Sequence, residues 1–322
     1  VVRMDPAKVD EVFSQVVFSG DDFKATFDKQ SGLLTSYIYK KQEYIHNGQG
    51  PQPFFWRAPT DNDYGAKLPT RLKAWREASY QTPKAESFNV SKDGDKSIVK
   101  VTYRFPQVDA QWEITYKVFA NGIIKVDNRF VAEGTETPMI PRVGLRMQLS
   151  EILNDLTYYG RGPEENYRDR RTSQFIGEYT TPIKDLYEPY IRPQENEHRT
   201  DIYWCALTTK QKAGLLFIAD RTFELNASNY LLGSLDSGET IDNGAPRTNE
   251  TNHRHLTDPQ PVKQVDMFID YRMMGVGGDN SWGAIAHEPY LIRPGVENAI
   301  EYGFSIVPFD KKADYKNLIY QY

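Results

Sequence analysis

The sequence predicts an all-β protein built around one large antiparallel sandwich. Apolar and polar residues alternate over many short segments, which is the period of a half-buried strand. Turn residues separate these segments, and the dipeptide Asn121-Gly122 between two of them is typical of a tight hairpin. Aromatic residues make up 13% of the chain, with 21 Tyr, and these residue types favour strands.

Helix signals occur only near the N-terminus. Asp5 followed by Pro6 resembles an N-cap with Pro at the first helical position, and apolar residues follow at helical spacing. A second short helix is predicted from Thr70, with Leu72 and Trp75 on one face. We therefore expect residues 1–17 to form a linker or helical appendage and residues 18–322 to form the sandwich domain.

The strands begin at residue 23. Residues 23–27 alternate, the next five supply turn chemistry, and residues 33–39 return as a partner strand. Further strands are predicted over residues 97–105, 112–118, 123–130, 144–149, 213–219, 264–271 and 300–307. Long polar loops are predicted over residues 51–68, 160–171, 187–200, 242–261 and 275–289, and such loops on a rigid sandwich commonly carry binding residues.

Composition narrows the classes of partner. Charged residues make up 26% of the 322 residues and the net charge is -5, so nothing favours nucleic acid or an anionic membrane surface. The single cysteine, Cys205, is expected in the core, and no apolar run is long enough for a bilayer. The chain does not begin with Met, so it can be part of something longer, and cytoplasm and periplasm both stay open.

One loop presents an aromatic residue. Residues 277–283 combine glycines and small polar side chains with Trp282. An indole in such a loop either stacks against a sugar ring or plugs the loop into its own core, and the sequence favours neither alternative.

Two other loop clusters, residues 56–63 and 194–199, mix carboxylates, amides and a guanidinium. These groups hydrogen-bond sugar hydroxyls, but they also make Asx-turns and salt-bridged loop ends. Residues 160–167 are similar in kind.

No catalytic or metal site is predicted in this chain. Glycoside hydrolysis needs two carboxyl groups about 5–10 Å apart, and no pair among the 44 Asp and Glu residues is singled out by its neighbours. His253 and His255 lie two residues apart, but no third ligand accompanies them. We expect solvated loop histidines there.

Five segments nevertheless occur in an order that resembles one family. They are residues 27–32, 57–63, 160–167, 189–190 with 195–196, and 275–282, and together they span most of the chain. In this order they are similar to the C-terminal domain of LacZ-type β-galactosidases of glycoside hydrolase family 2.

The resemblance implies a galactose mutarotase-like β-supersandwich and a division of labour. The catalytic glutamates and the magnesium and sodium ligands would lie on an upstream TIM barrel that this chain lacks, so the chain alone is expected to be inactive. Trp282 would reach the mouth of that barrel and contact the β-galactoside, and the parent enzyme would be an oligomer. The residues assigned to sugar binding are Trp282, Asp279, Asn280, Arg57, Asp61, Asn62, Glu195 and Arg199.

One position departs from the family pattern. The family reads Glu-Asn-Gly-x-Arg where this chain has Glu197 in place of the glycine and His198 after it. A histidine acid with a glutamate base is the machinery of aldose 1-epimerases, so a free-standing epimerase is one alternative function. A purely structural module that buries one face against other domains or subunits is another.

Overall fold

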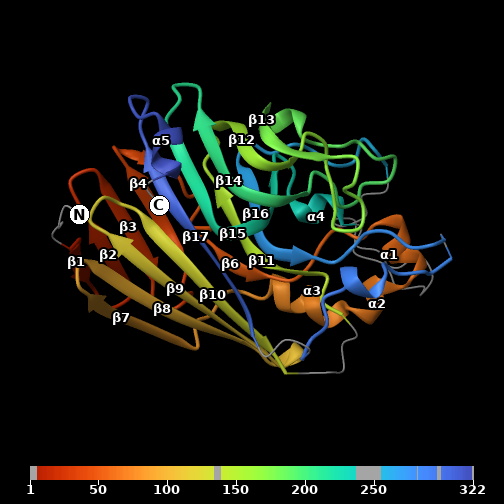
Figure 1. Ribbon diagram of the computed structural model, residues 1–322. Coiled ribbons are helices and arrows are strands. Elements are labelled where there is room, and N and C mark those ends of the chain that lie inside the picture. Colours follow the sequence, from red (N-terminus) through yellow and green to blue (C-terminus); the bar gives the residue numbers. More distant parts are fainter. Residues whose placement is uncertain (1–5, 134–138, 237–254, 281, 296–298, 321–322) are drawn as a thin grey trace.

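The computed structural model describes residues 6–133, 139–236, 255–280, 282–295 and 299–320. His253 and most of the predicted 242–261 loop lie outside these ranges, as does Ser281. Strands dominate the described part (Figure 1). The strands are β1 (Lys8–Glu11), β2 (Gln15–Ser19), β3 (Phe23–Asp28), β4 (Leu34–Tyr39), β5 (Gln42–Glu43), β6 (Gln52–Phe54), β7 (Ser87–Asp93), β8 (Lys96–Phe105), β9 (Ala110–Phe119), β10 (Ile124–Ala132), β11 (Arg142–Leu149), β12 (Leu153–Gly162), β13 (Phe175–Pro182), β14 (Arg199–Thr209), β15 (Gly214–Ser228), β16 (Val265–Met273) and β17 (Ile300–Phe309).

The helices are short. They are α1 (Asp61–Gly65), α2 (Leu68–Arg71), α3 (Lys73–Tyr80), α4 (Leu232–Leu235) and α5 (Tyr315–Ile319), with 3-10 turns η1 (Pro106–Val108), η2 (Ile183–Asp185) and η3 (Glu288–Tyr290). Figure 1 shows α1, α2 and α3 together at one end of the large sheet. The helix predicted from Thr70 corresponds to the end of α2 and to α3. No described helix is long and apolar enough to cross a bilayer.

Two antiparallel sheets form the sandwich. The smaller sheet has the order β1-β2-β3-β4-β5. The larger one runs β13-β12-β14-β15-β17-β10-β9-β8-β7, with β16 joining β15 to β11 and β11 joining β6. The sheets meet through buried aromatic residues: Phe27 of β3 packs edge-on against Tyr116 of β9, with ring centroids 5.0 Å apart.

Strict alternation produces the β9–β10 strand pair of the larger sheet. Every second residue of β9 is buried, and β9 pairs with β10 along its whole length. Gly122 takes a φ of +88° in the connecting turn, which explains the Asn-Gly dipeptide. An aromatic cluster under this pair joins α3 to the sheet: Phe55 lies 5.1 Å from Trp75 and 5.7 Å from Trp112, centroid to centroid.

The predicted N-terminal helix is wrong. Residues 8–11 form β1, in which Val9 pairs with Phe18 of β2, and Asp5 lies outside the described residues. Pairing with an existing sheet edge outweighs the local helix signal, because four residues of amphipathic sequence have little helix stability of their own. The expected division at residue 17 falls inside β2.

Candidate functional site

The loop that carries Trp282 leaves β16 and is fixed at its base by a buried ion pair. Arg57, only 2% exposed, donates from Nε and Nη2 to the Asp63 carboxylate at 3.0 and 2.8 Å. It also donates to the backbone carbonyls of Met274 (2.6 Å) and Gly275 (3.0 Å). Arg57 therefore ties α1 to the first residues of the loop.

A helix cap presents the carboxylate of that ion pair. The Thr60 hydroxyl accepts a hydrogen bond from the Asp63 N–H at 3.2 Å, and Asp63 accepts from the Thr60 N–H at 3.0 Å. This capping box begins α1 and orients Asp63 toward Arg57.

A second clamp holds the next two residues of the loop. Asp169 accepts hydrogen bonds from the N–H groups of Val276 (3.1 Å) and Gly277 (2.7 Å), while Asn62 donates to the Val276 carbonyl at 3.1 Å. A Cβ on Gly275 would lie 2.5 Å from the Asp169 carboxylate, so a glycine is required there for the close approach. Together, the contacts of Arg57 and those of Asp169 and Asn62 leave the base of the loop little conformational freedom.

The tip of the loop points into solvent. Trp282 is 92% exposed, and its backbone N–H donates to Asn280 Oδ1 at 2.8 Å in an Asx-turn. Asp279 is exposed and accepts from His287 Nε2 at 2.9 Å. The indole is not plugged into the core of this chain, so that alternative is wrong, and stacking of Trp282 against a sugar ring stays a prediction.

A small pocket lies at the foot of the loop. It has a volume of about 250 Å³ and brings together three of the predicted residues, Asp61, Asn62 and Glu195. Tyr190 and Arg170 also line it. Asp279, Asn280 and Trp282 do not line this pocket and lie further along the loop.

Arg57 and Arg199 have a structural role, because both are buried. Arg199 is 5% exposed and donates to the carbonyls of Glu197 and Pro163, the latter at 3.1 Å. Neither guanidinium lines the pocket at the foot of the loop. Of the two interpretations of these loop clusters, the structural one therefore describes these two arginines.

The departure at Glu197 keeps the backbone that glycine would adopt. Glu197 has a φ of +66°, in the left-handed region that favours glycine. Its side chain is buried and accepts a hydrogen bond from the Ser228 hydroxyl at 3.0 Å. Burial raises the pKa of Glu197 well above its ordinary value. The chain thus retains the turn and fills the space beside it with a carboxyl group.

A buried polar network lies behind this loop. Arg142, on β11 and fully buried, contacts the carboxylates of Glu195 (3.3 Å) and Asp270 (3.1 Å) and donates to Asn226 Oδ1 at 2.9 Å. Burial raises the pKa of Asp270 to about 7, against the opposing effect of Arg142. The network connects β11, β15 and β16 to the 194–199 segment.

His198 belongs to the same network and is doubly bonded. Its Nδ1 lies 2.7 Å from Asn226 Oδ1, and its Nε2 lies 2.9 Å from the Glu224 carboxylate. The Asn226 amide donates to Glu195 and to the Asn196 carbonyl, which fixes its oxygen toward His198. Both ring nitrogens therefore act as donors. Burial lowers the pKa of His198, but the hydrogen bond and charge of Glu224 outweigh it, so the pKa is raised.

This pairing predicts a pH-dependent contribution to stability. Because the folded pKa of His198 is raised, its charge stabilises the fold fully below the unfolded pKa, about 6.5, and that contribution is lost as pH rises through the folded value. We expect His198→Gln to lower the free energy of unfolding more at pH 6 than at pH 9. Urea unfolding of both proteins at the two pH values checks this, and an equal loss at both would contradict a charged His198.

Sequence reasoning missed Arg142, Asn226, Glu224, Asp270 and Asp169. All lie on strands or in a charged run where their types do not stand out. Only the Thr60-x-x-Asp63 capping box carried a readable signal. Among the described residues no group of three His, Cys, Asp or Glu side chains could hold a metal ion.

Comparison with solved structures defines the fold class. The fold matches galactose 1-epimerase from Lactobacillus acidophilus with a TM-score of 0.52, covering 94% of this chain and 99% of that one at 8% identity. The described part is thus a galactose mutarotase-like supersandwich, as predicted. The likeness concerns the fold alone.

The family follows from the sequence comparisons. The family model described as beta galactosidase small chain matches residues 19–306, and the chain belongs to this family. A beta-galactosidase from Priestia megaterium is 33% identical over 284 residues, which cover 88% of this chain and 26% of that protein. One from Streptococcus thermophilus is 30% identical over 291 residues, 89% and 26% of the two chains. The chain spans about a quarter of the length of these relatives.

Proposed function

We propose that this chain is the C-terminal, carbohydrate-binding part of a β-galactosidase and completes the sugar site of a separate catalytic barrel. One observation carries the proposal: Trp282 is 92% exposed on a loop whose base is fixed by the buried Arg57 and by Asp169. The relatives support it, since they bear the name beta-galactosidase and extend well beyond this chain.

The chemistry of an indole fits this role. The ring face packs against the C–H face of a pyranose, and the indole N–H remains free to hydrogen-bond. A loop held at its base loses little further freedom when sugar binds, so more of the stacking energy is retained. Asp279 and Asn280 on the same loop, and Asp61, Asn62 and Glu195 at its foot, offer hydrogen-bond partners for sugar hydroxyls.

The proposal places the acid and nucleophile carboxylates, with magnesium and sodium, on the barrel. It also takes the parent enzyme to be an oligomer, as the family resemblance implies. This chain would then contribute ring stacking, shape and exclusion of water at the second sugar.

The chain is expected to release no product from a chromogenic β-galactoside by itself. Activity should appear when it is mixed with the separately produced catalytic region of the same enzyme, because the two parts supply different groups of one site. Steady-state hydrolysis by each part and by the mixture measures this. Turnover by this chain alone would overturn the proposal.

An epimerase finds less support in the geometry. Ring opening needs an acid and a base on either side of a sugar, whereas His198 and Glu224 bond directly to each other at 2.9 Å and are both buried. No sugar atom fits between them.

A further inference from the structure

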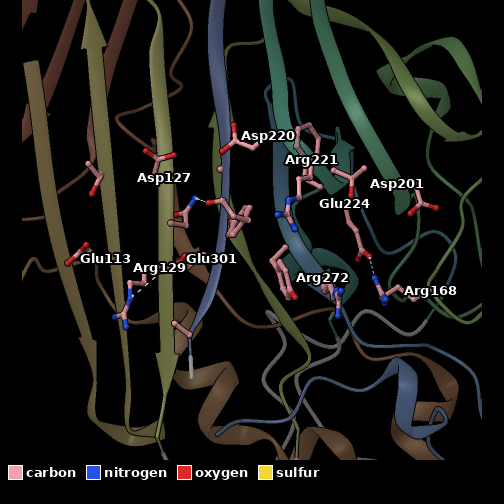
Figure 2. Close-up of a pocket in the computed structure, with 18 residues that line it drawn as sticks. Glu113, Asp127, Arg129, Arg168, Asp201, Asp220, Arg221, Glu224, Arg272 and Glu301 are labelled. Carbon is pink, nitrogen blue, oxygen red and sulfur yellow. Dashed lines mark hydrogen bonds and ion pairs between the residues drawn. The ribbon is translucent and has the colours of Figure 1, made fainter. Parts of the chain in front are cut away.

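A second pocket lies away from the Trp282 loop. Its volume is about 790 Å³, within the range of small-molecule sites, and strands β9, β10, β15, β16 and β17 contribute its lining (Figure 2). It shares no lining residue with the pocket at the foot of the Trp282 loop. We call it the strand groove.

Every carboxylate that lines the strand groove is already paired with a cation. Glu113 pairs with Lys100, Glu301 with Arg129, and Glu224 with Arg168 and His198. Lys117 and Lys125 pair with Asp127, and Lys125 also pairs with Asp220. Arg161 and Arg171 pair with Asp201. The acidic lining residues are Glu113, Asp127, Asp201, Asp220, Glu224 and Glu301. These carboxylates therefore have little capacity left to accept hydrogen bonds from a ligand.

Two guanidinium groups in the groove have no carboxylate partner among the described residues. Arg221 of β15 and Arg272 of β16 line it, and neither makes an ion pair with any other residue in the described part of the chain. Figure 2 shows both on the same half of the groove, near the Arg168–Glu224 pair. The Arg272 guanidinium lies 4.7 Å from the centre of the Tyr271 ring, which restrains it.

Aromatic rings form part of the same surface. Tyr271 and Tyr302 line the groove, are half-buried, and have ring centroids 6.2 Å apart. The Tyr302 hydroxyl donates to the Ile269 carbonyl at 3.0 Å, so this ring is fixed. Such rings next to hydrogen-bond donors are the combination that proteins use to hold sugars.

We propose that the strand groove binds a saccharide that carries a carboxylate. The planar forks of Arg221 and Arg272 match a carboxylate, and the tyrosine rings match a pyranose. A neutral saccharide would leave both guanidinium groups without an acceptor of matching charge. The six carboxylates around the groove and the net charge of -5 disfavour polyanions such as nucleic acid.

Calorimetric titration of the chain with digalacturonate, and with neutral digalactose as the matched ligand, tests this. We expect saturable binding of the acidic disaccharide only. Arg221→Gln and Arg272→Gln should each weaken it at least about tenfold. Arg104→Gln, an exposed arginine on β8 outside the groove, should leave it unchanged. Thermal unfolding of each variant verifies that it is folded.

Three results would overturn the proposal: no binding of digalacturonate, equal binding of digalactose, or affinity that both arginine variants leave unchanged. The test is separate from the proposed function. Arg221 and Arg272 do not line the Trp282 site, so these variants should keep hydrolysis by the mixture with the catalytic region, whichever way the titration falls.

Discussion

Replacing Arg142 with methionine is expected to lower the free energy of unfolding by about 3–5 kcal/mol. The substitution leaves Glu195 and Asp270 buried without their shared cation, 3.3 and 3.1 Å away in the native protein. It also removes the donor to Asn226, which in turn positions His198. The loss is large because no water can replace a cation at a position with no exposed surface.

Urea unfolding followed by tryptophan fluorescence measures this loss. Arg129→Met is the matched control, because Arg129 makes an exposed pair with Glu301 at 3.6 Å and should cost about 1 kcal/mol or less. A loss for Arg142→Met as small as that of the control would mean that the network does not hold the loops in place.

Arg57→Met is expected to have the second largest effect, also about 3–5 kcal/mol. Asp63 would remain buried and unpaired, and the carbonyls of Met274 and Gly275 would lose their donor. Because those carbonyls begin the Trp282 loop, the variant should also weaken sugar binding by that loop. Stability and binding are then linked through one side chain.

A double-mutant cycle with Asp63→Asn isolates the ion pair. We expect a coupling energy above about 1 kcal/mol between the two positions, measured by urea unfolding. Arg71→Met on neighbouring α2 controls for loss of an exposed arginine. Additive losses at Arg57 and Asp63 would show that the ion pair does not anchor the loop.

Parts of the fold could be predicted wherever one face of a strand is buried and the other is not. The β9–β10 hairpin is such a case, because its alternation and its Asn121-Gly122 turn are both local signals. β12 and β14 were missed since their burial does not alternate cleanly, and β12 contains two glycines. β13 is an exposed edge strand with weak patterning. Burial on both faces comes from neighbours that the local sequence does not reveal.

The candidate site, too, could be predicted only where the local sequence carries a signal. Display of Trp282 is confirmed, and its loop composition pointed to it. The role of Arg57 and Arg199 could not be predicted, because residue type alone does not distinguish a buried brace from an exposed ligand. The contact of Arg142 with Asp270 joins positions far apart in the chain, which only the sheet order β11-β16 brings together.

Assaying Trp282→Ala in the mixture with the catalytic region asks directly whether this chain completes the sugar site. Phe175→Ala, which removes another exposed aromatic ring on β13, is the matched control, and Trp282→Phe retains a stacking face. We expect kcat/KM for a β-galactoside to fall about tenfold or more with Trp282→Ala, to recover partly with Trp282→Phe, and to be unchanged with Phe175→Ala. An unchanged kcat/KM for Trp282→Ala would contradict the claim that this chain completes the sugar site.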